Sequence, residues 1–162
     1  MNDFIIYALR VGGGTLALAP LPGAGGDYAG DMAHIRDWKP ALVVSLTMPT
    51  EMHEAGAQSL GSEVQEAGTR WIAFPIPDFG VPDYSQVEAW NKASQDIRRA
   101  LAGGGRVLIH CRGGCGRSGM IALRLMIENG EAPDEALQRL RHIRPCAVET
   151  EAQLRWARRR IA

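Results

Sequence analysis

The residues best suited to chemistry lie in one glycine-rich segment, where Cys111 is followed six positions later by Arg117. A cysteine thiolate is a strong nucleophile when its surroundings favour the anion. A guanidinium group can bind two oxygens of one phosphate, and glycines let the intervening backbone N–H groups approach the same anion. The pattern therefore predicts attack on a phosphate by Cys111. The predicted phosphate-binding residues are Arg112, Gly113, Gly114, Cys115, Gly116 and Arg117.

The elements on either side of this segment position it for anion binding. Residues 106–110 are an apolar run that predicts a strand, and residues 118–128 predict a helix that begins near Ser118. A strand that leads through a glycine-rich turn into a helix directs backbone N–H groups and the positive helix end at one point. A cysteine and an arginine at this spacing are weak evidence alone, since Cys111 could be a buried structural thiol. The strand–loop–helix context favours the nucleophile.

The rest of the chain predicts an α/β fold in one domain over residues 1–162, with a central, mostly parallel sheet and helices on both faces. Residues 4–11 and 15–19 predict a β-hairpin, and residues 41–46 and 69–74 predict two further strands. The prolines of residues 75–83 exclude regular structure and predict an ordered loop. Helices are expected over residues 27–39, within 47–68, from 85 to 102, over 134–144 and over 150–161.

Three motifs resemble those of a known family. Residues 110–119 resemble HCxxGxxR[S/T]G, the signature loop of the protein tyrosine phosphatases. Their form is most similar to that of the dual-specificity branch, in the group that contains cyclin-dependent kinase-associated phosphatase. Residues 78–83 resemble the mobile acid loop of this branch, and residues 149–153 resemble its ETxxQ segment. Together the motifs imply a dual-specificity-phosphatase-like fold and a phosphatase activity.

The resemblance also implies a role for each of four residues. Cys111 attacks phosphorus and forms a phosphocysteine intermediate, while Arg117 binds the equatorial oxygens. Asp78 protonates the leaving oxygen and then activates water, which suits a carboxyl group on a closing loop. Ser118 donates a hydrogen bond to the thiolate, although a serine at this point could equally be a helix N-cap, and it can be both.

Several neighbouring residues have more than one interpretation. Asp83 competes with Asp78 as the acid, but the order of the motif favours Asp78 and makes Asp83 a cap of the helix near Ser85. His110 is expected to fix the shape of the loop rather than to transfer protons. Gln153 either helps to place the attacking water or is a polar residue on a helix surface.

The three cysteines are an odd number without a framework of pairs, which favours a reducing compartment. Cys115 is interpreted either as a filler of the loop or as a redox partner of Cys111, although such a bond would require a change of the backbone. A zinc site at His110, Cys111 and Cys115 is rejected because no fourth ligand follows at a recognised spacing. We therefore predict no metal and no cofactor.

Composition limits the partners of the protein. A formal net charge of zero and a pI of about 6.9 give no global attraction to nucleic acid or to anionic membranes. No signal peptide and no stretch long enough to span a bilayer is recognised, so we expect a cytoplasmic protein without stable membrane association. The oligomeric state is left open.

Phosphomonoester hydrolysis is the function that these patterns favour. The expected partner is a phosphorylated protein that carries phosphotyrosine, with phosphoserine and phosphothreonine as further candidates. A phosphoinositide phosphatase is the alternative, but its loop often carries several basic residues, and here only Arg112 lies between the nucleophile and Arg117. A non-catalytic phosphate-binding module ranks lower because it would not need the thiol and the acid together.

Overall fold

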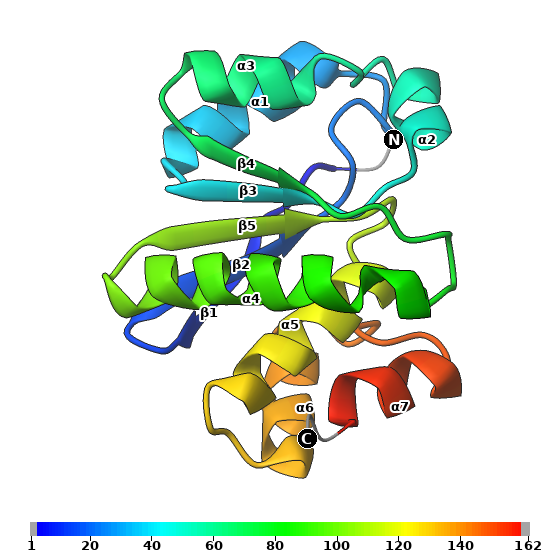
Figure 1. The fold of residues 1–162 in the computed structure, drawn as a ribbon. Helices are drawn as coiled ribbons and strands as arrows, with labels where there is room; N and C mark the ends of the chain where they lie inside the picture. The colour runs from blue at the N-terminus through cyan, green and yellow to red at the C-terminus, as the bar shows by residue number, and fades with distance from the viewer. Residues whose placement is uncertain (1–2, 160–162) are drawn as a thin grey trace.

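The computed structural model describes residues 3–159, which form a five-stranded sheet with helices on both faces (Figure 1). The strand order is β1-β2-β5-β3-β4. Strand β1 pairs antiparallel with β2, and all other neighbouring strands are parallel. The predicted α/β fold with a mostly parallel sheet is confirmed. The strands are β1 (Tyr7–Val11), β2 (Gly14–Ala19), β3 (Leu42–Ser45), β4 (Arg70–Ala73) and β5 (Arg106–His110).

Two groups of helices cover the two faces of the sheet. Figure 1 shows the first group above the sheet and the second below it. The first group is α1 (Tyr28–Trp38), α2 (Pro49–Glu54) and α3 (Leu60–Glu66). The second group is α4 (Val87–Ala102), α5 (Gly116–Glu128), α6 (Pro133–Ile143) and α7 (Glu151–Arg158).

Some helix boundaries differ from those predicted. A 3₁₀ turn (Tyr84–Gln86) precedes α4, and Gln86 accepts a hydrogen bond from the Asp83 N–H at 2.7 Å, so Asp83 lies at the cap of this turn as expected. Helix α5 begins at Gly116 rather than near Ser118, because the glycine-rich loop already winds into the first helical turn. The last helix, α7, ends at Arg158, because the backbone of Arg159 is extended, so it stops before the predicted end at Ile161, which lies outside the described residues.

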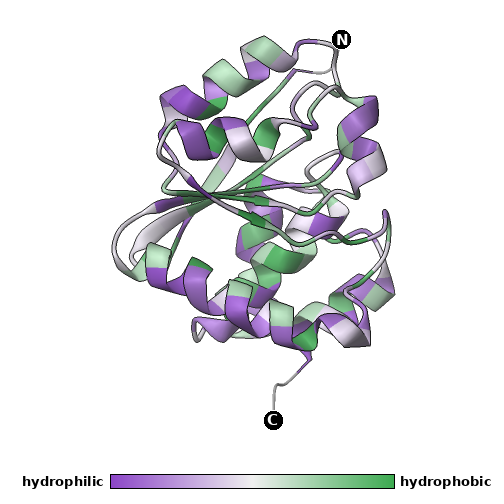
Figure 2. Cartoon of the chain, turned by 45° about the horizontal axis from the view of Figure 1, so that its top comes forward, coloured by the Kyte–Doolittle hydropathy of each residue, from purple (hydrophilic) through white to green (hydrophobic). Residues whose placement is uncertain are grey.

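The sheet separates two hydrophobic cores because successive side chains of a strand point to opposite faces. In β5, Val107 and Ile109 pack into the core under α4 and α5, whereas Leu108 packs into the core under α1 and α3. All three side chains are fully buried, and each contributes about 1.5–3 kcal/mol to the free energy of unfolding. Figure 2 shows hydrophobic strands between helices whose outer faces are hydrophilic.

The arrangement of the parallel strands sets the place of the functional site. Strands β2, β5, β3 and β4 run in the same direction, so their carboxyl ends meet at one edge of the sheet. In Figure 1 this is the edge to which their arrowheads point. Among residues 3–159, no helix is long and apolar enough to cross a membrane.

Candidate active site

Each of the four parallel strands delivers a segment to the candidate site. The 111–117 loop follows β5, and Leu21 follows β2 and donates its N–H to the Arg112 carbonyl at 3.0 Å. Glu51 on α2 follows β3, and Asp78 follows β4. Residues from four separate parts of the chain therefore converge because the sheet aligns the ends of its strands.

Cys111 lies at the base of this site, at the amino end of α5. Its side chain is 3% exposed, and its Sγ lies 2.8 Å from the Ser118 Oγ. Ser118 lies inside the first turn of α5, whose N-cap is Cys115, so the interpretation of Ser118 as the N-cap is wrong. The hydroxyl group is free to donate to a thiolate, and the positive end of the helix favours that anion.

Arg117 is held by two acidic side chains and one carbonyl group. Its Nη1 donates to Glu51 Oε1 at 2.8 Å and to the Ile76 carbonyl at 2.9 Å, and its Nη2 donates to Glu51 Oε2 at 2.8 Å. Nη2 also lies 3.2 Å from Asp78 Oδ1. The remaining Nε is buried and finds no acceptor among residues 3–159. A buried donor without an acceptor is rare, and this one suits a phosphate oxygen.

Hydrogen bonds and nearby charges keep both Glu51 and Arg117 ionised. The hydrogen bond from Arg117 lowers the pKa of the Glu51 carboxyl group, against the opposing effect of burial. Burial alone would lower the pKa of the Arg117 guanidinium, but the hydrogen bond to Glu51 and the nearby negative charges raise it. Glu51 thus fixes the orientation of the guanidinium, which leaves the Nε edge available to a ligand.

The backbone N–H groups of the 111–117 loop are also available. None of the N–H groups of residues 112–116 donates to an acceptor within the described part of the chain. Gly114 has a φ of +73°, and a Cβ there would lie 2.8 Å from the Ala19 carbonyl carbon. At Gly116 a Cβ would collide with the Glu149 side chain, whereas at Gly113 there is open space. Gly114 is therefore required by conformation and by room, whereas the obstacle at Gly116 is the end of the exposed, flexible Glu149 side chain.

His110 supports the loop from below. Its ring is fully buried, and Nε2 lies 2.6 Å from the Ser45 Oγ, which accepts a hydrogen bond from Trp71 Nε1 at 2.9 Å. Because an indole N–H only donates, the Ser45 hydroxyl proton is left for His110 Nε2. Nδ1 then carries the proton and faces the Cys111 carbonyl at 3.4 Å. Burial lowers the pKa of His110 from 6.5 to about 4, so the ring is neutral at physiological pH.

The acid loop lies over this arrangement and is fastened to α7. Asp78 contacts Arg117, whereas Asp83 lies at the start of the turn before α4 and accepts a hydrogen bond from Ser85. Gln153 is fully buried, its Nε2 donates to the Gly80 carbonyl at 3.2 Å, and its Oε1 accepts from the Glu149 N–H at 2.9 Å. Gln153 is not a surface residue, and its amide group holds the acid loop.

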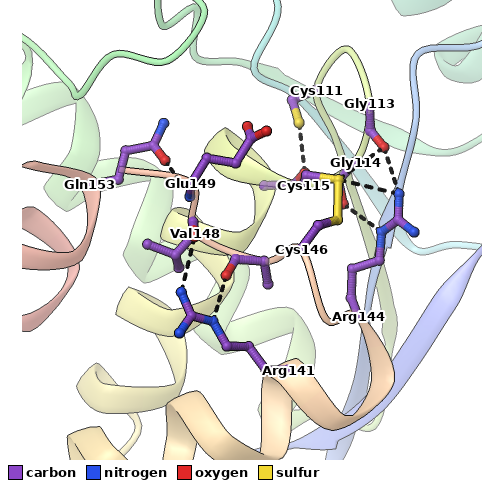
Figure 3. Close-up of a disulfide and its surroundings, with 12 residues drawn as sticks. Cys111, Gly113, Gly114, Cys115, Arg141, Arg144, Cys146, Val148, Glu149 and Gln153 are labelled. Carbon is purple, nitrogen blue, oxygen red and sulfur yellow. Dashed lines mark hydrogen bonds between the residues drawn. A yellow bond between two sulfur atoms is a disulfide. The ribbon is translucent and has the colours of Figure 1, made fainter. Parts of the chain in front are cut away.

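Cys115 departs from both interpretations made from the sequence. It forms a disulfide with Cys146, 31 residues away, and Cys111 is free (Figure 3). Cys115 is therefore neither a filler nor the partner of Cys111, because the chain returns from α6 along the outer side of the loop and brings Cys146 beside it. A disulfide is unusual in reducing compartments, so it also disagrees with the expectation of a reducing compartment. No cluster of potential metal ligands occurs within residues 3–159.

A family model decides the classification of the chain. The model described as "Swiss Army Knife protein, DSP-PTPase phosphatase domain" matches residues 31–157. The chain belongs to this phosphatase-domain family. The family confirms the resemblance to the dual-specificity branch of the cysteine-dependent protein tyrosine phosphatases.

Proteins similar in sequence to this phosphatase domain support the same classification. Cyclin-dependent kinase inhibitor 3 of Rattus norvegicus is 35% identical over 82 residues, which are 49% of this chain and 37% of the relative. The protein from Mus musculus is 36% identical over 81 residues. The aligned part of the chain thus spans less than half the length of these curated relatives.

Solved structures of phosphatases have a similar fold. Tk-PTP in its active form is 32% identical, with a TM-score of 0.70 and 86% of both chains covered. Kinase associated phosphatase has a TM-score of 0.83 and covers 98% of this chain and 94% of its own, at 21% identity. PTPMT1 in complex with PI(5)P has a TM-score of 0.71 at 19% identity.

Sequence reasoning missed three residues of the phosphatase-domain site. Glu51 lies in a short helix whose sequence carries no motif, and only the fold brings it to Arg117. Arg144 and Cys146 follow α6 and contact the outer side of the 111–117 loop. No sequence signal pointed to any of the three, because the odd number of cysteines favoured a reducing compartment rather than a Cys115–Cys146 pair.

Proposed function

We propose that this protein hydrolyses phosphomonoesters on proteins, with Cys111 as the nucleophile and Asp78 as the general acid. The observation that carries the proposal is the convergence of four groups on one point. At the amino end of α5 lie a buried thiol, a hydroxyl group 2.8 Å from it, and an Arg117 Nε and backbone N–H groups that find no acceptor within residues 3–159, and together they could bind a phosphate. Such preorganised donors stabilise the charge of a transferring phosphoryl group.

The reaction would follow from the roles of these groups. The Cys111 thiolate attacks phosphorus, and the ester oxygen leaves with a proton from Asp78, which gives a phosphocysteine. Water activated by Asp78 then attacks this intermediate and releases inorganic phosphate and the thiolate. Ser118 stabilises the departing thiolate, and Arg117 binds the phosphoryl oxygens in both steps. Gln153 and Gly80 keep the acid loop over the site.

Protein phosphotyrosine is the preferred substrate class because the surroundings of the loop are not strongly basic. Two cavities flank Arg112, with volumes of about 430 Å³ and 160 Å³. In the first, Asp3 and Asp31 balance Arg112 and Arg144, and in the second, Glu51 and Glu54 outnumber Arg112. These carboxyl groups oppose a polyphosphorylated head group. Phosphoserine and phosphothreonine are further candidate substrates.

Turnover of two aryl phosphates tests the mechanism. Cys111→Ser should abolish the hydrolysis of phenyl phosphate, because the serine hydroxyl group is not ionised at neutral pH. Asp78→Asn should slow the hydrolysis of phenyl phosphate by about 10²- to 10⁴-fold, the usual range for general acid catalysis. It should slow the hydrolysis of p-nitrophenyl phosphate far less, because nitrophenolate leaves without a proton. Asp83→Asn is the matched control and should leave both rates nearly unchanged. Turnover by Cys111→Ser, or equal losses for Asp78→Asn and Asp83→Asn, would contradict the assignments.

A second comparison tests the substrate class. The catalytic efficiency should be greatest for phosphotyrosine peptides and lower for phosphothreonine peptides and for inositol phosphates. A preference for inositol phosphates would refute protein phosphotyrosine as the substrate while leaving the phosphatase chemistry intact.

A further inference from the structure

Every carbonyl group of residues 112–115 is bonded by a donor from outside the 111–117 loop. Leu21 donates its N–H to the Arg112 carbonyl at 3.0 Å. Arg144 donates from Nη2 to the Gly113 carbonyl at 2.8 Å and from Nε to the Gly114 carbonyl at 3.1 Å (Figure 3). Val148 donates its N–H to the Cys115 carbonyl at 3.3 Å.

These outer bonds determine where the inner N–H groups point. In a planar trans peptide unit the C=O and the following N–H point in opposite directions. Holding the carbonyl groups of residues 112–115 outward therefore turns the N–H groups of residues 113–116 inward, toward the phosphate position. The positive charge of Arg144 also polarises two of these peptide units, which strengthens their N–H groups as donors.

Residues 144–148 supply most of these hydrogen bonds to the carbonyl groups of the loop. They also supply the disulfide that links the loop to this segment, the only one within the described chain. Cys146 forms the disulfide with Cys115, and the Cα atoms of the two cysteines are 5.2 Å apart. Arg144 is held in place by the ring of Tyr7, whose centroid lies 4.2 Å from its guanidinium carbon. Arg141 donates to the carbonyl groups of Ala147 and Val148 at 2.9 and 3.0 Å, which fixes the backbone of this segment.

We propose that residues 144–148 form a brace that positions the phosphate-binding N–H groups, and that the Cys115–Cys146 disulfide makes the affinity of the loop for phosphate depend on redox state. The oxidised protein is the form that binds phosphate tightly. This direction is opposite to inactivation by oxidation of a catalytic thiol, since the bridge leaves Cys111 free. The inference rests on the proposed phosphate-binding role of the loop.

Reduction opens the bridge by thiol–disulfide exchange. A thiolate of a dithiol such as dithiothreitol attacks one sulfur of the bridge, and the other sulfur leaves as a thiolate. The second thiol of the reagent then resolves the mixed disulfide. The reagent becomes a cyclic disulfide, and Cys115 and Cys146 end as two thiols. Both cysteines are partly exposed, so a small dithiol can reach them.

The dependence of phosphate affinity on the Cys115–Cys146 disulfide is tested in the Cys111→Ser protein. This variant lacks the catalytic thiol, so it can neither hydrolyse a substrate nor be oxidised at position 111. Binding of inorganic phosphate is measured by calorimetry on the oxidised protein and after reduction with dithiothreitol. We expect about 3- to 10-fold weaker binding after reduction, because a loosened loop must be ordered again by its ligand. The Cys111→Ser, Cys146→Ser protein is the matched control and should bind at the weaker affinity in both conditions.

The outcomes separate the brace from the proposed function. Equal phosphate affinity of the oxidised and reduced Cys111→Ser protein would overturn the redox proposal while leaving the phosphatase assignment intact. Absence of phosphate binding in both forms would overturn the phosphate site itself and the brace with it.

Arg144 is tested separately as a positioning residue. Arg144→Gln should weaken phosphate binding and lower kcat/KM about tenfold, and Arg144→Lys should recover only part of this loss because an ammonium group cannot bond two carbonyl groups in a fixed fork. Arg139→Gln is the matched control, since Arg139 lies on α6 and bonds Glu131 and the Arg10 carbonyl instead. If Arg144→Gln lowers the melting temperature but leaves the phosphate affinity of the folded protein unchanged, the role of Arg144 is structural and the proposal is wrong.

Discussion

Replacing Glu51 with glutamine tests whether the orientation of Arg117 depends on a residue that carries no motif. The carboxylate of Glu51 accepts two hydrogen bonds of 2.8 Å from the Arg117 guanidinium, and the two side chains are 12% and 1% exposed. Glutamine has nearly the same shape but keeps a single carbonyl acceptor. The substitution therefore removes the charge and one charge-assisted hydrogen bond, and it leaves the packing in place.

The size of the effect follows from these contacts. A hydrogen bond to a charged group contributes about 1.5–3 kcal/mol, and little solvent screens this pair. If about 2–3 kcal/mol of this is lost in the transition state, kcat/KM falls roughly 30- to 150-fold. The pKa of Glu51 is lowered from 4.5 by Arg117, so the stabilisation that it gives is complete above pH 4.5 and is lost as the pH falls through the lower folded value.

The assay compares Glu51→Gln with Glu54→Gln, because Glu54 lies on the same helix, is exposed and forms no ion pair within residues 3–159. We expect the large loss of kcat/KM toward an aryl phosphate only in Glu51→Gln, together with a lower free energy of unfolding at pH 7. The unfolding free energy of Glu51→Gln should also change less between pH 5 and acidic pH than that of the wild type. A loss of kcat/KM below about threefold in Glu51→Gln would refute the argument that Glu51 orients Arg117.

Two further predictions concern how residues in and beside the 111–117 loop affect the stability of the protein. Gly114→Ala should lower the free energy of unfolding by about 1–3 kcal/mol, because Gly114 has a positive φ and a Cβ there would meet the Ala19 carbonyl group. Gly113→Ala should lower it by less than about 1 kcal/mol, because a Cβ at Gly113 meets open space. Urea unfolding measures both values, and equal losses would contradict this prediction. Because the pKa of His110 is lowered from 6.5 to about 4, the unfolded state binds a proton first, so stability should fall by up to about 3 kcal/mol as the pH drops from 6.5 to 4. His110→Gln should remove this part of the pH dependence, and an unchanged pH profile of that variant would show that the buried ring does not cause it.

The sequence predicted the fold class because its signals are local. The alternation of short apolar runs with periodic helical segments is sufficient for an α/β sheet, and residues 106–110 and 41–46 were predicted as strands close to their observed bounds. Boundaries were less accurate where a turn merges into a helix. Helix α5 begins at Gly116 because the glycine-rich loop winds directly into the first helical turn.

The residues of the 111–117 loop and its neighbour Ser118 could also be recognised from sequence, because one strand–loop–helix unit supplies them all. A single segment determines both their spacing and their direction, and the Cys111–Ser118 contact needs no other part of the fold. The motif order likewise indicated Asp78 ahead of Asp83, and only Asp78 contacts Arg117.

Only the tertiary structure decided which distant residues complete the site. Glu51 meets Arg117 because β3 and β5 are neighbours in the sheet, and Cys146 meets Cys115 because the chain returns along the loop after α6. Neither pairing has a sequence signal, since strand order and helix return are set by packing of whole elements. The sequence by itself thus indicated a candidate nucleophile and the loop that would bind its substrate, and the tertiary structure decided what orients Arg117 and what holds the loop from outside.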